Sequence, residues 1–368
     1  MTSALSDRTV AVLGAGGAGQ GMAGYLASQG FEVRLWNRDD PGEVRDWLEP
    51  ISSAGELTVT GLLTGRVPIA AATSDVERAI SGAGTVFVLT TADAHREVGQ
   101  NAASFLADGQ LLVIMACKTG GALDVRAGLS RDLTDRIVIA EAPTTLVNSR
   151  ISGPGVVEIL GVKRSIPLAT LPSSDLGHAL GRLGDLPFRP ESDVLKTSLS
   201  NFSIALHTVP MIMNAGWTES TRGGYLYYSE GITRGIANVM EAVEEERLRI
   251  AARLETETVR LEDYLVDSLE APPGDLYESI QGCVMYRSVK APASVNHKYL
   301  WEDVMAGVVP MVGLGRGLNE PTPLLEAILN LASSLLKVDL QAKGRTLARL
   351  GLDGLDARGI RDFVRTGH

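Results

Sequence analysis

The spacing of apolar residues divides the chain into two parts. In the first part, short apolar or alternating runs are separated by helix-like segments, and the runs cover residues 10–13, 31–38, 85–89, 111–115, 136–143 and 165–172. Runs of this length between helical segments are typical of strands in an α/β protein. We therefore predict a Rossmann-type, doubly wound and mainly parallel sheet.

Near residues 187–190 the pattern changes to that of helices. Apolar residues recur at helical spacing in residues 235–254 and again in residues 322–340. The acidic and basic residues of "EAVEEERLR" (residues 241–249) are expected to face solvent on the other side of their helix. This change predicts two domains, a dinucleotide-binding domain over residues 1–188 and a mostly helical domain over residues 189–368.

The first apolar run leads directly into a glycine-rich turn. In "VAVLGAGGAGQGMAGYLASQG", Gly14-x-Gly16-x-x-Gly19 lies between a strand and a helix. Gly14 would permit a tight turn, Gly16 the close approach of a pyrophosphate, and Gly19 the packing of helix on strand. Because a second strand follows at the expected distance, the motif predicts a dinucleotide cofactor with its phosphates at the helix N-terminus.

The residues after two strands bear on the identity of this cofactor. The second strand ends at Asn37 and Arg38, followed by Asp39 and Asp40. Arg38 can pair with a 2′-phosphate, which favours NADP (NADPH), while a solvated arginine beside two aspartates leaves NAD open. Thr90 follows the third strand, at the carboxyl edge where such sheets bind ligands, and is a further candidate for cofactor binding.

Composition excludes several classes of partner. The 368-residue chain is 45% hydrophobic, with a net charge of −10 and a pI near 5.1. This acidic balance argues against nucleic acid, which needs a basic surface. We find no signal peptide, membrane span or zinc-ligand spacing. Two isolated cysteines, Cys117 and Cys283, suggest a reducing compartment, so we expect a cytoplasmic protein without metal.

One histidine lies in an otherwise apolar segment. His207, one of five histidines, is in the middle of "NFSIALHTVPMIMNAG" (residues 201–216). Such a residue is either a core histidine that donates to a backbone carbonyl or an acid whose pKa suits proton transfer. Asn201, about two helical turns earlier, could reach a ligand or cap the helix. Residue type alone leaves both alternatives open.

Five ordered segments that span nearly the whole chain together resemble the octopine/nopaline (opine) dehydrogenase family. They are "GLLTGRVPIAAATSDVERAI" (61–80), "VVEILGVKRSIPLATLP" (156–172), the segment 201–216, "YYSEGITRGIANVMEAVEEERLRIA" (227–251) and "KYLWEDVMAGVVPMVGLGRGLNEPTPLLEAILNLA" (298–332). The resemblance implies a Rossmann-type domain joined to a helical domain, with the substrates in the cleft between them. It also implies reductive condensation of an amino acid or amine with a 2-oxo acid, giving a secondary amine.

The resemblance also implies roles for individual residues. The family's acid and its orienting aspartate correspond to His207 and Asp303. The family arginine that handles a substrate carboxylate corresponds to Lys298, which offers a point charge in place of a bidentate fork. Asn201 is a further candidate for substrate binding. The segment "MACKTGG" (115–121) also departs from the family, which commonly has proline-glycine before the TGG, and it places Lys118 near the expected cofactor edge.

Two other functions use the same residues. One is an NADPH-dependent reductase of a 2-oxo acid or ketone without an amine partner. The other is a non-catalytic NADPH-binding module, which would not need His207 and Asp303. For the assembly, we consider a homodimer formed through the helical domain.

Overall fold

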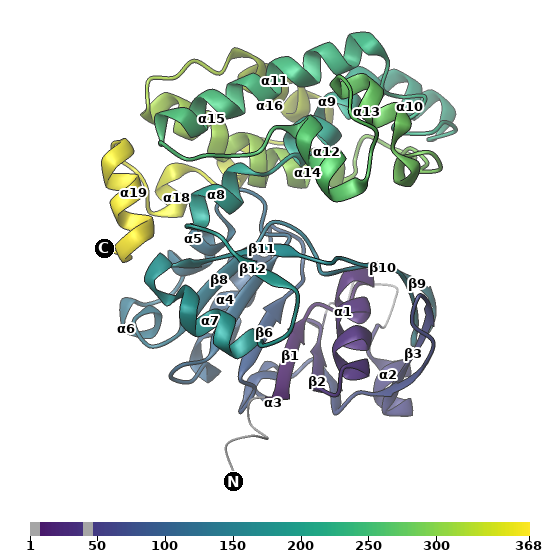
Figure 1. The fold of residues 1–368 in the computed structure, drawn as a ribbon, viewed down its shortest axis with the longest axis vertical. Coiled ribbons are helices and arrows are strands. Elements are labelled where there is room, and N and C mark those ends of the chain that lie inside the picture. The colour runs from purple at the N-terminus through teal and green to yellow at the C-terminus, as the bar shows by residue number, and fades with distance from the viewer. Residues whose placement is uncertain (1–7, 40–46) are drawn as a thin grey trace. The chain divides into compact units, whose positions relative to one another are not determined.

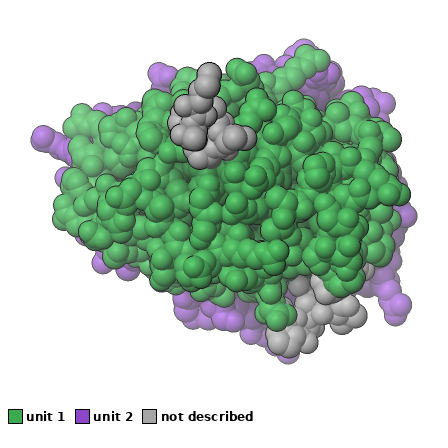
Figure 2. Space-filling view, turned by 90° about the horizontal axis from the view of Figure 1, so that it is seen from below, with its two compact units in different colours: residues 1–117, 121–197, 363–368 green, residues 118–120, 198–362 purple. Residues whose placement is uncertain are grey.

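The chain forms two compact units in a computed structural model that describes residues 8–39 and 47–368. Unit 1 comprises Met1–Cys117, Gly121–Thr197 and Phe363–His368, and unit 2 comprises Lys118–Gly120 and Ser198–Asp362 (Figure 2). The change of unit therefore falls after Thr197, where the sequence places it after residue 188. The loop Lys118–Gly120 belongs to unit 2 although the chain on both sides of it belongs to unit 1, and the C-terminal segment Phe363–His368 returns to unit 1.

Unit 1 is built on an eight-stranded sheet with the order β12-β11-β8-β7-β6-β1-β2-β5 (Figure 1). The pairing is parallel except between β11 and β8, which confirms the predicted Rossmann-type sheet. The strands are β1 (Thr9–Leu13), β2 (Glu32–Trp36), β5 (Ala71–Thr73), β6 (Thr85–Val88), β7 (Leu111–Met115), β8 (Val138–Ala142), β11 (Ile166–Leu171) and β12 (Phe188–Pro190). Each of the six predicted strands is present.

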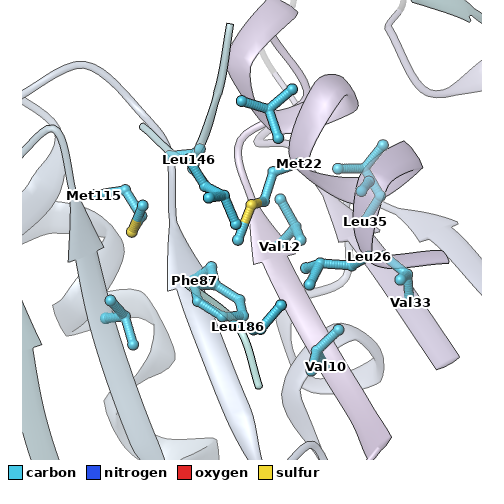
Figure 3. Packing of buried hydrophobic residues seen from close by; sticks show 14 of the residues in the cluster. Val10, Val12, Met22, Leu26, Val33, Leu35, Phe87, Met115, Leu146 and Leu186 are labelled. Carbon is cyan, nitrogen blue, oxygen red and sulfur yellow. The ribbon is translucent and has the colours of Figure 1, made fainter. Parts of the chain in front are cut away.

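Helices flank this sheet in unit 1. They are α1 (Gly17–Ser28), α3 (Val76–Ile80), α4 (His95–Ala102), α5 (Gly121–Arg126), α6 (Arg131–Thr134) and α7 (Leu176–Leu183), while α8 (Val194–Leu199) crosses the unit boundary. The central strands are buried on both faces, which explains their unbroken apolar sequences. Val12, Met22, Phe87 and Leu146 come together between sheet and helix in this core (Figure 3).

A second, four-stranded sheet packs against α1. Its order is β4-β3-β10-β9, with β3 (Glu56–Gly61), β4 (Gly65–Pro68), β9 (Val147–Gly153) and β10 (Val156–Val162), and α2 (Glu49–Ala54) precedes it. Glycines along α1 allow the contact: a Cβ at Gly21 would lie 2.0 Å from Ser149 Oγ, and one at Gly24 would lie 2.9 Å from Val59 Cγ2. The helix therefore packs between two sheets without side chains at these positions.

Unit 2 is helical, as predicted. It contains α9 (Val209–Met213), α10 (Ala215–Thr221), α11 (Arg234–Arg253), α12 (Leu261–Leu269), α13 (Leu276–Gly282), α14 (Lys298–Asp303), α15 (Val309–Gly317), α16 (Pro323–Leu336), α17 (Leu340–Lys343) and α18 (Leu347–Leu350), and α19 (Ala357–Thr366) crosses into unit 1. Two turns, η4 (Ile204–Thr208) and η6 (Val304–Val308), are π-helical. Within residues 8–39 and 47–368, no helix combines the length and apolar character needed to cross a membrane.

Three charged residues of α11 contradict the expectation that this helix face is solvated. Glu244, Glu246 and Arg247 are 1%, 2% and 1% exposed. Glu246 accepts hydrogen bonds from the backbone N–H groups of Leu324 and Leu325 at 2.9 and 3.0 Å, so it satisfies the first turn of α16. These residues are buried because each has polar partners on other elements, which helical periodicity does not reveal.

Candidate active site

The glycine loop in unit 1 has the geometry of a dinucleotide cradle. Gly14 has φ +119°, and a Cβ there would lie 2.7 Å from the carbonyl oxygen of Leu89. A Cβ at Gly19 would lie 1.7 Å from the Gly14 oxygen, whereas Gly16 has no atom within 4 Å of its Cβ position. Gly16 is the N-cap of α1 and no side chain caps the helix, so its first N–H groups are available to a phosphate.

Asn37 and Thr90 border this loop. The side chain of Asn37 accepts a hydrogen bond from the Ala15 N–H at 3.1 Å, so it supports the loop itself. Thr90 N lies 3.1 Å from the Cβ position of Gly14, and the buried Thr90 hydroxyl has no hydrogen-bond partner in the described part of the chain. A buried polar group without a partner is costly, and a ligand that supplies the partner removes that cost. These residues therefore fit a nucleotide cofactor.

Arg38 follows β2 and points its charge outward. Its side chain is 54% exposed, and one guanidinium nitrogen lies 4.0 Å from Glu97 Oε2. An ion pair of this length and exposure contributes little to stability. Asp39 is also exposed, and Asp40 lies outside the described residues.

In unit 2 the structure brings His207 and Asp303 together. His207 Nδ1 lies 2.7 Å from Asp303 Oδ2, with side-chain exposures of 20% and 1%. The imidazole stacks on the Tyr299 ring at 4.0 Å between centroids, and the Tyr227 hydroxyl donates to the His207 carbonyl at 2.6 Å. The ring is thus fixed, and its Nε2 makes no hydrogen bond to the residues that the structure describes.

The second oxygen of Asp303 binds a lysine that the sequence did not predict for this position. Lys118 Nζ lies 2.5 Å from Asp303 Oδ1, and Ser203 Oγ lies 2.8 Å from the same oxygen. Ser203 is also 2.5 Å from Asn201 Oδ1, while Asn201 donates to the Thr119 hydroxyl at 3.2 Å. The amide of Asn201 is therefore bonded at both ends inside unit 2.

Asp303 is ionised in this setting. Burial acts to raise the pKa of the carboxyl group, but the charges of Lys118 and His207 more than offset it, so that the pKa of Asp303 lies well below its usual range. The carboxylate then has three partners on two oxygens, as a buried anion requires.

Lys298 is not part of this network. It is the first residue of α14 and is exposed, and its side chain makes no hydrogen bond or ion pair within residues 8–39 and 47–368. Lys118, from the loop after β7, is the ammonium that contacts Asp303. The signal for it in the sequence was the lysine of "MACKTGG", which stands out as a departure from the family.

Two π-helical turns carry the pair. Turn η4 contains His207, and η6 follows directly after Asp303. Gly307 in η6 lies close to η4, because a Cβ there would be 2.9 Å from Ile204 Cγ1 and 3.0 Å from Asn201 Nδ2. Wide turns of this kind often occur at functional sites, since they redirect side chains that a regular helix would space evenly.

A glycine loop that fits a nucleotide in a Rossmann-type unit and a His–Asp pair in a helical unit are the features expected of a two-domain nicotinamide-dependent dehydrogenase. Two family models match the chain. Residues 9–157 match the NAD-dependent glycerol-3-phosphate dehydrogenase N-terminus, and residues 190–336 match the α-helical domain of the NAD/NADP octopine/nopaline dehydrogenases.

Comparisons over nearly the whole chain identify the family to which this protein belongs. The chain is 35% identical to the opine dehydrogenase of Arthrobacter sp. (strain 1C), over 98% of its own length and 99% of that protein. It therefore belongs to the opine dehydrogenase family, which confirms the resemblance found in the sequence. The structure of octopine dehydrogenase in complex with NADH and agmatine has the same fold, with a TM-score of 0.80, 98% of both chains covered and 21% identity. Yersinopine dehydrogenase with NADP+ bound gives a TM-score of 0.72, with 97% of both chains covered and 16% identity.

Proposed function

We propose that this protein is an NAD(P)H-dependent opine-type dehydrogenase, which condenses an amino acid or other amine with a 2-oxo acid and reduces the resulting C=N bond to a secondary amine. The observation that carries the proposal is the 2.7 Å contact between His207 and the buried carboxylate of Asp303. Membership of the opine dehydrogenase family supports the choice of reaction.

His207 acts as the acid or polarising group, with Asp303 as its orienting partner. A bound nicotinamide supplies the hydride, and reduction also requires a proton or positive charge at the substrate heteroatom. Asp303 binds Nδ1, so that Nε2 is the ring nitrogen from which a proton can pass to the substrate. The stacked ring of Tyr299 prevents the imidazole from turning away.

Two residues are proposed to bind substrate. Lys298 presents an exposed ammonium at the start of α14, and we assign it to a substrate carboxylate as a point charge. Asn201 keeps one amide hydrogen beyond its bond to Thr119, and we assign that hydrogen to a polar substrate atom. Lys298→Ala should then raise KM for one carboxylate substrate by about tenfold, the effect of one lost charged hydrogen bond, with a smaller change in kcat.

The proposed cofactor contacts are those of Gly14, Gly16, Gly19, Asn37 and Thr90, which form the loop and its border. NADPH is proposed as the preferred cofactor because of Arg38. Relatives are known with either cofactor, since octopine dehydrogenase was solved with NADH and yersinopine dehydrogenase with NADP+.

The cofactor preference is tested by Arg38→Ala. We expect kcat/KM with NADPH to fall by at least about tenfold, the loss of one charged hydrogen bond to phosphate, and kcat/KM with NADH to change little. Arg66→Ala is the control, because Arg66 is also an exposed arginine of unit 1, with its side chain 75% exposed. Equal loss with both cofactors, or a wild-type preference for NADH, would contradict the assignment.

The reaction is tested by following NADPH and NADH oxidation with 2-oxo acids, each with and without amino acids and amines, and by identifying products by mass spectrometry. We expect turnover only when both partners are present, a secondary-amine product, and loss of turnover in His207→Ala. His178→Ala is the matched control, because His178 is exposed on α7. Reduction of the oxo acid alone would show a simple reductase, and turnover that survives in His207→Ala would refute the assigned acid.

A further inference from the structure

Lys118 occupies a backbone conformation that favours glycine. Its φ is +58°, and Ala116 in the same loop has φ +49°. A residue with a Cβ pays an energy penalty in this left-handed region, and such residues persist only where the surroundings hold them. Because glycine would adopt this backbone at lower energy, the presence of lysine points to a use for its side chain.

Backbone hydrogen bonds hold the loop of Lys118 within unit 2. The Thr119 N–H donates to the Ala306 carbonyl at 3.0 Å, and the buried Arg345 donates to the Thr119 carbonyl at 3.0 Å. The Gly120 N–H donates to the Ser198 hydroxyl at 2.9 Å. The loop is thus fixed to η6 on one side and to the segment that leads into η4 on the other, which places the Lys118 ammonium on the carboxylate.

Lys118 and His207 bind different oxygens of the same carboxylate, that of Asp303. Lys118 Nζ is 2.5 Å from Oδ1 of Asp303, and His207 Nδ1 is 2.7 Å from Oδ2. We infer that Lys118 is a positioning residue which neutralises Asp303, so that the imidazolium of His207 is a stronger proton donor than it would be beside an unpaired aspartate. The inference rests on the proposed function in that it gives His207 the role of acid.

The physical reason is that Lys118 places a second cation beside the carboxylate that His207 binds. A carboxylate beside an imidazole favours the charged, protonated form of the ring. An ammonium on the same carboxylate opposes that effect through its like charge. A cation on the orienting carboxylate therefore favours release of the proton from the imidazolium, which is what a general acid has to do.

The tyrosine and histidine side chains around the pair do not supply this charge. Burial raises the pKa of Tyr227 and of Tyr299, so both are neutral at physiological pH. Burial first, and then the charges of Lys298 and His207, lower the pKa of His297, which is also neutral there. Glu244 and Arg247 on α11 form an ion pair with each other, and Lys298 is exposed at the start of α14.

The test reads the protonation of His207 at neutral pH from its ring ¹⁵N shifts, measured by ¹H–¹⁵N NMR on protein labelled at histidine and assigned with His207→Gln. In Lys118→Met these shifts should move toward those of the imidazolium, because the opposing charge is removed. Lys118→Arg restores the charge and should give shifts close to those of the wild type. Lys337→Met is the matched control, because Lys337 also has a left-handed backbone, with φ +53°, and is exposed.

Ring shifts of His207 that do not change in Lys118→Met, or that move toward those of the neutral imidazole, would overturn the inference, and Lys118→Gln repeats the measurement if the methionine variant does not fold. The measurement needs no turnover, so its result is independent of the substrate panel. A move toward the imidazolium without any amine-dependent turnover would leave the inference standing and remove the proposed function. In an active enzyme, the basic limb of the kcat/KM profile should move to higher pH in Lys118→Met.

Discussion

Arg247 provides the sharpest test of how unit 2 is stabilised. The guanidinium is 1% exposed and all five of its N–H groups have acceptors. Nε donates to Glu244 at 2.9 Å, Nη1 to the Leu199 carbonyl at 2.5 Å and to Thr258 at 2.9 Å, and Nη2 to Glu244 and to the Val259 carbonyl at 2.7 Å. We predict that Arg247→Met strongly destabilises this unit.

The magnitude follows from the partners that remain. Methionine fills much of the volume but leaves the Glu244 carboxylate, 1% exposed, without its cation. Breaking a buried ion pair by removing one partner costs about 3–5 kcal/mol, which corresponds to a fall in Tm of roughly 6–20 °C for a unit of this size. Most of that cost is the orphaned charge, so Arg247→Met with Glu244→Leu should be more stable than Arg247→Met alone by at least about 1 kcal/mol.

The assay is urea unfolding followed by far-UV circular dichroism, with Arg249→Met as control. Arg249 lies on the same helix but is 46% exposed in its pair with Glu320, so its loss should cost no more than about 1 kcal/mol. Equal destabilisation by Arg247→Met and Arg249→Met would refute the reasoning. So would a double variant less stable than Arg247→Met alone.

Three further predictions follow from local geometry. In Gly19→Ala the new Cβ would lie 1.7 Å from the Gly14 oxygen, so the loop must shift, and cofactor affinity measured by fluorescence titration should fall by at least about tenfold. Gly307→Ala should destabilise the protein by about 1–3 kcal/mol through overpacking and lower kcat more than it changes KM, as measured by urea unfolding and steady-state kinetics. Burial lowers the pKa of Lys163 to about 8, so the unfolded chain binds more protons between that pH and about 10.4 and stability should rise with pH across this window. In Lys163→Met that part of the rise should be absent from unfolding curves measured at pH 8 and pH 10.

The main sheet of unit 1 could be predicted because its strands are buried on both faces. Such strands have unbroken apolar sequences, as in "LLVIM" of β7. The glycine motif fixes the first connection from strand to helix. The helices α11 and α16 were predictable from the helical spacing of their apolar residues, because one face of each helix packs in a core. The pairing of His207 with Asp303 came from the family resemblance.

Other features depend on contacts between distant segments. The second sheet has short, partly exposed strands, and its packing depends on Gly21 and Gly24 of α1, whose role is visible only when β9 and β3 lie against them. Arg247 has the same charge as Arg249, and only the carbonyls of Leu199 and Val259 make it a buried residue. Single-sequence patterns carry no information about such partners.

The two segments that carry His207 and Asp303 share a pattern which explains how they meet. Both continue as Val-Pro-Met, at residues 209–211 and 309–311, and both have a π-helical turn just before it. A proline inside a helix lacks an N–H and clashes with the carbonyl four residues earlier, and a wider turn relieves both problems. In this alignment Gly307 occupies the position of His207, three residues before the proline. At the equivalent position, η4 therefore has the His207 side chain and η6 has only a glycine. The missing side chain is what lets η4 approach η6 closely enough for His207 to bind Asp303.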